Sequence, residues 1–152
     1  MIEIPQNSTV YAVIMLLAGI GIPIMAALNA GLGTKLQSPA LAAGILFLVA
    51  MIASVSYLLL VEGIPASFSA PSMPFYYYLG GLFVVFYVLS VTWIAPQFGI
   101  GNAVSFVLLG QLISMATIDQ FGLMGAPQTS LTLPRIMGLL FMAIGIFLVV
   151  RK

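Results

Sequence analysis

The sequence predicts an all-α integral membrane protein, a bundle of five membrane-spanning helices. Of its 152 residues, 62% are hydrophobic and only 5% are charged, and the mean hydropathy is +1.24. A soluble domain carries about a quarter charged residues, so this chain cannot form a water-exposed surface. Its apolar runs reach the roughly 20 residues that a spanning helix needs, whereas the strands of a membrane barrel would alternate over about 10 residues.

Five apolar segments separated by short Gly, Pro and polar breaks form the predicted spans of one transmembrane domain, residues 1–152. We expect helices at about 9–32, 39–61, 75–94, 100–118 and 134–150.

The first two spans are bounded by turn-forming residues. The first ends at GLGTKLQSP, a turn-like stretch that carries Lys35. We expect no signal-peptide cleavage, because the segment before this span holds Glu3 and no Lys or Arg, and the span is long and contains Pro23. The second span begins after Pro39 and stops at Glu62, where the Pro- and Ser-rich loop EGIPASFSAPSMP follows.

The last three spans have interface signals at their ends. The third carries FYYY at one end and Trp93 at the other, as aromatic belts do at the two membrane interfaces. APQFG gives a tight break before the fourth span, and DQFGLMGAPQTSLTLP is the next loop. Pro134 suits the first turn of the fifth helix, and the closing RK is an interfacial anchor.

Basic residues set the orientation only weakly. Five spans place the termini on opposite sides, with Arg135 on the N-terminal side and Lys35, Arg151 and Lys152 on the other. The three-to-one split favours a cytoplasmic C-terminus by the positive-inside rule. Because one substitution would nearly erase this bias, two interpretations stay open: insertion in both orientations, or insertion in a single orientation.

Several chemistries are absent from the composition. The chain has no cysteine and no histidine, which excludes disulfides, thiolate nucleophiles, zinc clusters and imidazole relays. The three acids, Glu3, Glu62 and Asp119, fall at span ends, and no pair is placed for acid/base work or for a metal. The four basic residues are scattered, and no Gly-rich phosphate motif occurs. We therefore expect no enzyme activity, cofactor, metal site or nucleic-acid partner.

Gln111 is the most conspicuous polar residue inside a span. An unpaired amide in hydrocarbon costs several kcal/mol, so Gln111 should face protein or water. Ser114 lies one turn further and shares its face with Val104 and Val107. Two interpretations stay open: an interhelical hydrogen bond worth roughly 0.6 kcal/mol, or a substrate or water pathway.

The first and third spans hold further candidates. Pro23 removes a backbone hydrogen bond and bends its helix, and Asn29 follows about two turns later, where it either lines a cavity or acts as a capping or packing amide. Tyr87 and Ser90 lie on one stripe of the third span, which is either a helix-packing surface or a binding wall. Trp93 is interpreted as an interface anchor.

Asp119 lies at the C-terminal end of the fourth helix, where the macrodipole disfavours an anion. We therefore expect a partner for it, such as Arg135 on the same side of the membrane. A structural role is the first interpretation and proton coupling the alternative.

The order of several motifs carries a family resemblance. GIPIMAALNAGLG, SPALAA, YLGGLFVVFYVLSVTWIAPQFG, GQLISMATIDQFGLMG and PRIMGLLFMAIGIFLV together resemble the five-helix YdcZ family of the drug/metabolite transporter superfamily, over about residues 14–150. The tract Gly110-Gln111, followed by Asp119-Gln120-Phe121-Gly122, is the most specific part. The family more often has histidine where Gln120 stands, so a proton role of that histidine does not carry over.

The resemblance implies a multi-pass transporter of a prokaryotic inner membrane that moves a small organic molecule by alternating access. For a single five-helix unit, it implies an antiparallel, dual-topology homodimer of ten helices with a cavity near the midplane. Small multidrug resistance proteins, which are distant relatives, use a membrane-embedded glutamate that has no mid-span equivalent here. A neutral or zwitterionic substrate therefore fits better than a cationic drug.

The candidate residues fall into two groups under this interpretation. The candidates for substrate binding are Asn29, Tyr87, Ser90, Gln111 and Ser114, and those for structure or gating are Pro23, Trp93, Asp119 and Arg135. Two other classes remain: a passive pore, which needs a continuous water path, and an accessory membrane subunit without transport of its own.

Overall fold

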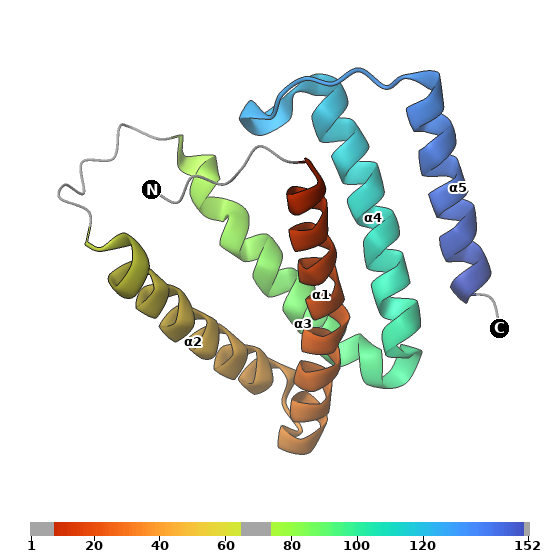
Figure 1. Ribbon diagram of the computed structural model, residues 1–152. Coiled ribbons are helices and arrows are strands. Elements are labelled where there is room, and N and C mark those ends of the chain that lie inside the picture. Colours follow the sequence, from red (N-terminus) through yellow and green to blue (C-terminus); the bar gives the residue numbers. More distant parts are fainter. Residues whose placement is uncertain (1–7, 65–73, 151–152) are drawn as a thin grey trace. The chain divides into compact units, whose positions relative to one another are not determined.

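The structure, a computed structural model, describes residues 8–64 and 74–150. Within these ranges five helices are long and apolar enough to span a membrane, which confirms the predicted fold class. They are α1 (Ser8–Leu36), α2 (Pro39–Tyr57), α3 (Gly80–Phe98), α4 (Ile100–Phe121) and α5 (Leu133–Val150) (Figure 1). A π-helical turn, η1 (Leu58–Glu62), extends α2, and two 3₁₀ segments, η2 (Phe75–Leu79) and η3 (Leu123–Gly125), precede α3 and follow α4.

The chain forms two compact units. The first, Met1–Gln97, contains α1, α2 and α3, and the second, Phe98–Lys152, contains α4 and α5. Within the second unit α4 and α5 run side by side, joined by the loop that includes η3 (Figure 1).

The connection between α1 and α2 is shorter than the sequence predicts. We expected the first helix to end near residue 32, but α1 continues to Leu36 and takes up most of GLGTKLQSP. Lys35 in its last turn is favourable to the helix dipole. Only Gln37, with a φ of 53°, and Ser38 form the turn. The Ser38 hydroxyl accepts from the Leu41 N–H at 3.1 Å and so caps α2, while Pro39 occupies its first turn.

The break between α3 and α4 is also shorter than predicted. The expected helix end at residue 94 is wrong, because α3 continues through Pro96 to Phe98. Gly99 alone makes the turn, with a φ of 91° that suits glycine. The Asn102 side chain donates to the Phe98 carbonyl at 2.9 Å, which satisfies one acceptor at the end of α3.

The fourth helix likewise extends beyond its predicted end at residue 118. It reaches Phe121 and ends at Gly122, whose left-handed conformation (φ 59°) forms the C-cap. Asp119 is therefore inside the last turn of α4.

Small side chains allow the helices of the first unit to approach closely. The buried residues on α1 and α2 include Ala26, Ala30, Ala42 and Ala43. Small residues at helix contacts are typical of membrane bundles, where van der Waals packing drives association.

Gly33 is the point at which α1, α2 and α3 come together. A Cβ atom added there would lie 2.7 Å from the Thr92 Cγ2 atom, 3.5 Å from the Pro39 Cα atom and 3.6 Å from the Ala42 Cβ atom. The first distance is too short for a real contact, so glycine is required for this approach of α1 to α3.

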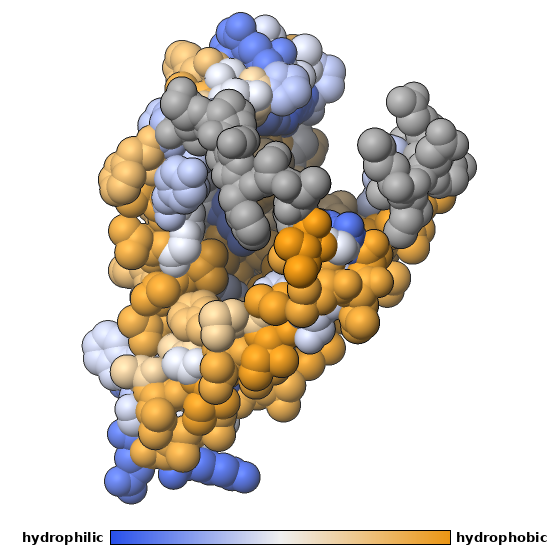
Figure 2. Space-filling model, turned by 90° about the vertical axis from the view of Figure 1, so that its left-hand side faces the viewer, coloured by the Kyte–Doolittle hydropathy of each residue, from blue (hydrophilic) through white to orange (hydrophobic). Residues whose placement is uncertain are grey.

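Most of the described surface is apolar, as Figure 2 shows for one face. Large hydrophobic residues on all five helices are exposed, among them Leu28, Val49, Phe83, Phe106 and Phe147. Such a surface suits contact with lipid tails or with other membrane helices.

Gly33→Ala should lower stability because the new methyl group overpacks the meeting point of three helices, at a cost of about 1–3 kcal/mol. Gly31→Ala is the matched control, since nothing lies within 4 Å of a Cβ atom at that position of the same helix. Thermal unfolding of the purified variants in detergent checks this. An apparent Tm for Gly33→Ala equal to that of Gly31→Ala would contradict the packing.

Candidate functional site

A pair of polar side chains is buried between α1 and α3. The Asn29 amide nitrogen donates to the Thr92 hydroxyl oxygen at 2.5 Å, and the two residues are only 4% and 3% exposed. Both lie within candidate membrane spans, Thr9–Leu36 and Phe75–Phe98. Because hydrocarbon offers no hydrogen-bond partner, this pairing removes the cost of placing the two groups there.

Tyr87 brings a third polar group to the same place. Its hydroxyl oxygen is buried and has no hydrogen-bond partner among the described residues. An unsatisfied buried hydroxyl costs about 1–3 kcal/mol, so it calls for an explanation.

The three polar residues line one hollow in the first unit. It is too narrow to hold a water molecule, and its other walls are apolar: Met25, Ala26, Val88 and Val91. In this conformation the side chains around the polar groups therefore leave no space for a ligand.

The chemistry of this α1–α3 polar centre is that of neutral hydrogen bonding. An amide and two hydroxyls can donate to and accept from a small molecule, while the methionine, valine and aromatic surfaces give apolar contact. Among the residues that the structure describes, no charged side chain lines the hollow. These groups can form hydrogen bonds, and none of them is a general acid or base near neutral pH.

The structure brings together two of the five predicted binding residues, Asn29 and Tyr87. Ser90 is half-buried on α3 and does not line the hollow. Gln111 and Ser114 belong to the second unit, where both are exposed, and neither side chain forms a hydrogen bond within the described ranges.

Thr92 is the member of this centre that sequence reasoning missed. A signal was present: Thr92 lies four residues before Pro96, which has no N–H to donate to the Thr92 carbonyl. A polar residue at such a position within a span is a candidate for contacts outside its own helix.

Two of the residues predicted to have a structural or gating role, Pro23 and Trp93, lie on α1 and α3. Pro23 lies inside α1 without ending it, and it is half-buried. Trp93 is 62% exposed near the end of α3, as an interface anchor requires.

An ion pair joins the end of α4 to the beginning of α5. Arg135 donates to the Asp119 carboxylate, so the partner expected for Asp119 is present. Hydrogen bonds also fasten the intervening loop to the same turn, among them one from the Thr129 N–H to the Asp119 carbonyl at 2.8 Å and one from the Leu131 N–H to the Gln120 side-chain oxygen at 2.7 Å. Asp119 and Gln120 thus hold the loop against the helix end.

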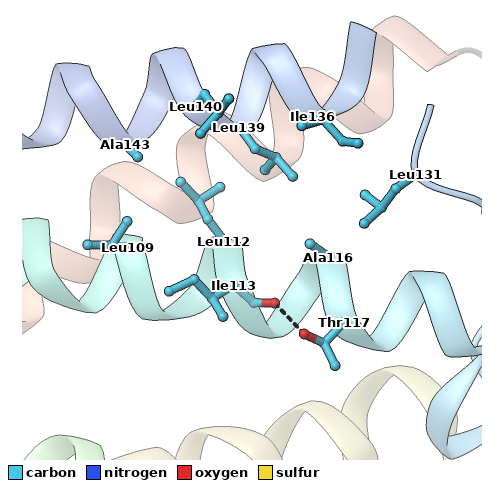
Figure 3. Close-up of a pocket in the computed structure, with 10 residues that line it drawn as sticks. All are labelled: Leu109, Leu112, Ile113, Ala116, Thr117, Leu131, Ile136, Leu139, Leu140 and Ala143. Atoms are coloured by element: carbon cyan, nitrogen blue, oxygen red, sulfur yellow. Dashed lines mark hydrogen bonds between the residues drawn. The ribbon is translucent and has the colours of Figure 1, made fainter. Parts of the chain in front are cut away.

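A larger groove, of about 410 Å³, lies between α4 and α5 (Figure 3). Nine of its ten lining residues are apolar, and the hydroxyl of the tenth, Thr117, donates to the Ile113 carbonyl of its own helix at 2.9 Å. The groove presents no free polar side chain that could orient a ligand. We therefore place the candidate site at the α1–α3 polar centre instead.

Comparison with known proteins gives one informative match. The model of the family described as "Putative inner membrane exporter, YdcZ" matches residues 10–148, nearly the whole chain. The resemblance found in the sequence is confirmed, and that family is described as an exporter and not as an enzyme. No curated protein and no solved structure matches the chain.

A double-mutant cycle should detect the bond between Asn29 and Thr92. Combining Asn29→Ala with Thr92→Val should show a coupling energy of about 0.6 kcal/mol and at most about 1.7 kcal/mol, the range for interhelical hydrogen bonds in membrane proteins. Equilibrium unfolding in mixed detergent checks it. The matched control couples Asn29→Ala to Thr117→Val, whose hydroxyl bonds its own helix; additive effects in both cycles would contradict the contact.

Proposed function

The chain belongs to the YdcZ family, and from this premise we propose that it exports a small organic molecule across a prokaryotic inner membrane by alternating access. We further propose that two copies in opposite orientations form the working carrier. The chain itself is an integral membrane protein with five helices able to span the bilayer within the part that the structure describes.

The observation that supports this proposal is the α1–α3 polar centre. Asn29 and Thr92 are buried together inside two spans, and Tyr87 adds a hydroxyl that lacks a partner. Polar groups within membrane spans are costly to keep there, which makes them candidates for a substrate pathway. A ligand acceptor atom would give the Tyr87 hydroxyl its missing hydrogen bond.

The chemistry of the centre favours a molecule without net charge. Lys35, Glu62, Asp119 and Arg135 all lie within the first or last turns of their helical segments, and none of them is among the described residues that line the hollow. An ion with net charge would have no counter-charge at the polar centre, and burying it unpaired would be costly. A neutral or zwitterionic metabolite with hydrogen-bond acceptors and an apolar portion fits best.

Alternating access requires α1 and α3 to move apart, since the hollow is too narrow for water in this conformation. Pro23 lies six residues before Asn29, inside the span, and its missing N–H weakens the helix at that point. We assign Pro23 the role of hinge. A passive pore, the alternative, would need a continuous water path, and the α1–α3 polar centre provides none in this conformation.

The small excess of basic residues on one side supports the inverted pair, because it gives a copy little preference between the two orientations. Two such copies would be related by an axis in the membrane plane, as inverted repeats are in many transporters. Each copy would then present its polar centre to the opposite side of the membrane.

Tyr87→Phe tests whether the hydroxyl serves a ligand. Removing an unpartnered buried hydroxyl should leave the Tm unchanged or raise it, while export falls about 5–10-fold, the effect of losing one hydrogen bond. Small molecules in the medium are compared by mass spectrometry for cells that produce the wild type, the variant or no protein. Tyr78→Phe, an exposed tyrosine of η2, is the matched control and should export normally.

Asn29→Ala provides the second arm of this experiment and should also reduce export in a variant that remains folded. Unchanged export by both Tyr87→Phe and Asn29→Ala would refute a ligand site at the α1–α3 polar centre.

A further inference from the structure

Gln111 lies within a span, and its side-chain amide has no hydrogen-bond partner among the described residues of its own unit. It is exposed on α4, and no hydrogen bond of its side chain occurs in the described part of the chain. Lipid tails cannot satisfy an amide, so this side chain needs a protein partner or water.

The face of α4 that carries Gln111 points away from α5. Leu109, Leu112 and Ala116 of α4 line the groove shared with α5, as Figure 3 shows. At 100° per residue, Gln111 lies roughly 130° around the helix from the centre of these three. Helix α5 therefore does not supply the missing partner.

The position of Gln111 along α4 suits contact with an identical residue. In Ile100–Phe121 it has eleven residues before it and ten after it, so it stands at the midpoint. When two copies of a helix pack antiparallel, only the residue at the centre of the crossing meets its own counterpart. An amide has both donor and acceptor atoms, so two facing glutamines can each donate to the other.

The flanking residues support the same arrangement. Val104 and Ile118 lie seven residues before and after Gln111, on one stripe of the helix. In an antiparallel pair centred on Gln111, each would face the other in the second copy, giving apolar contacts on both sides of the amides. Gly110, next to Gln111 in the chain, carries no side chain, and small residues of this kind allow membrane helices to approach closely.

We propose that α4 packs against α4 of a second, inverted copy, with the two Gln111 amides hydrogen-bonded to each other at the centre of the crossing. This inference rests on the proposed antiparallel assembly and names its contact surface. It leaves the α1–α3 polar centre, and not Gln111, as the place where the exported molecule binds.

Disulfide cross-linking in native membranes tests the contact, and the chain has no cysteine of its own. Under mild oxidation, Gln111→Cys should form a covalent dimer, because the two Cα atoms would approach the roughly 4.4–6.8 Å that a disulfide spans. Ile113→Cys is the control at nearly the same depth, since its side chain lies in the groove with α5. It should give severalfold less dimer.

A mixed pair tests the direction of packing with Gln111 intact. Val104→Cys and Ile118→Cys should cross-link when produced together and should not cross-link when either is produced alone. Self-cross-linking of both single variants would show a parallel pair and overturn the proposal.

Cross-linking of neither Gln111→Cys nor the mixed pair would also overturn the proposal and would place another part of the chain, or a different protein, against this face. Export by the wild type and the labelling of its termini are measured separately. If the cross-links fail while the wild type still exports and both of its termini are still labelled, the α4 contact alone is refuted. The proposed function then stands.

Discussion

Hydrocarbon provides no hydrogen-bond partner, and this constraint determines the placement of the polar side chains in this chain. Asn29 and Thr92 meet it by bonding to each other across 63 positions of sequence. Asp119 meets it at a helix end, where Arg135 neutralises the carboxylate and the following loop bonds to the same turn. Thr34 and Thr117 meet it within their own helices by donating to carbonyls one turn earlier.

The bond between Asn29 and Thr92 depends on how closely α1 approaches α3, and Gly33 makes that approach possible. A larger residue at position 33 would clash with the methyl group of Thr92. This methyl group and the hydroxyl that accepts from Asn29 are bonded to the same Cβ atom. Packing and polar pairing are therefore coupled at this point. The unpartnered hydroxyl of Tyr87 is the exception in a centre that is otherwise satisfied. Under the proposed function, a bound molecule would supply the missing acceptor.

The number and class of the helices could be predicted because apolar runs of spanning length dominate the composition. Helix ends were less predictable: the glycines before Lys35 and the proline at position 96 indicated breaks, yet both stretches remain helical and single turns at Gln37–Ser38 and Gly99 suffice. Asn29 and Tyr87 could be identified as polar residues inside spans. Their meeting with Thr92 could not, because it depends on the crossing of helices that are distant in sequence, and Thr92 lies off the stripe formed by Tyr87 and Ser90.

Five spans and few basic residues make the orientation of each copy the decisive property of the proposed carrier. Single cysteines at Gln6 and Lys152, both outside the described residues, can be labelled with an impermeant reagent from one side of intact cells. Two coexisting orientations predict that both sites react, each in about half of the molecules. Reaction at only one of the two sites would show a single orientation and contradict the inverted homodimer.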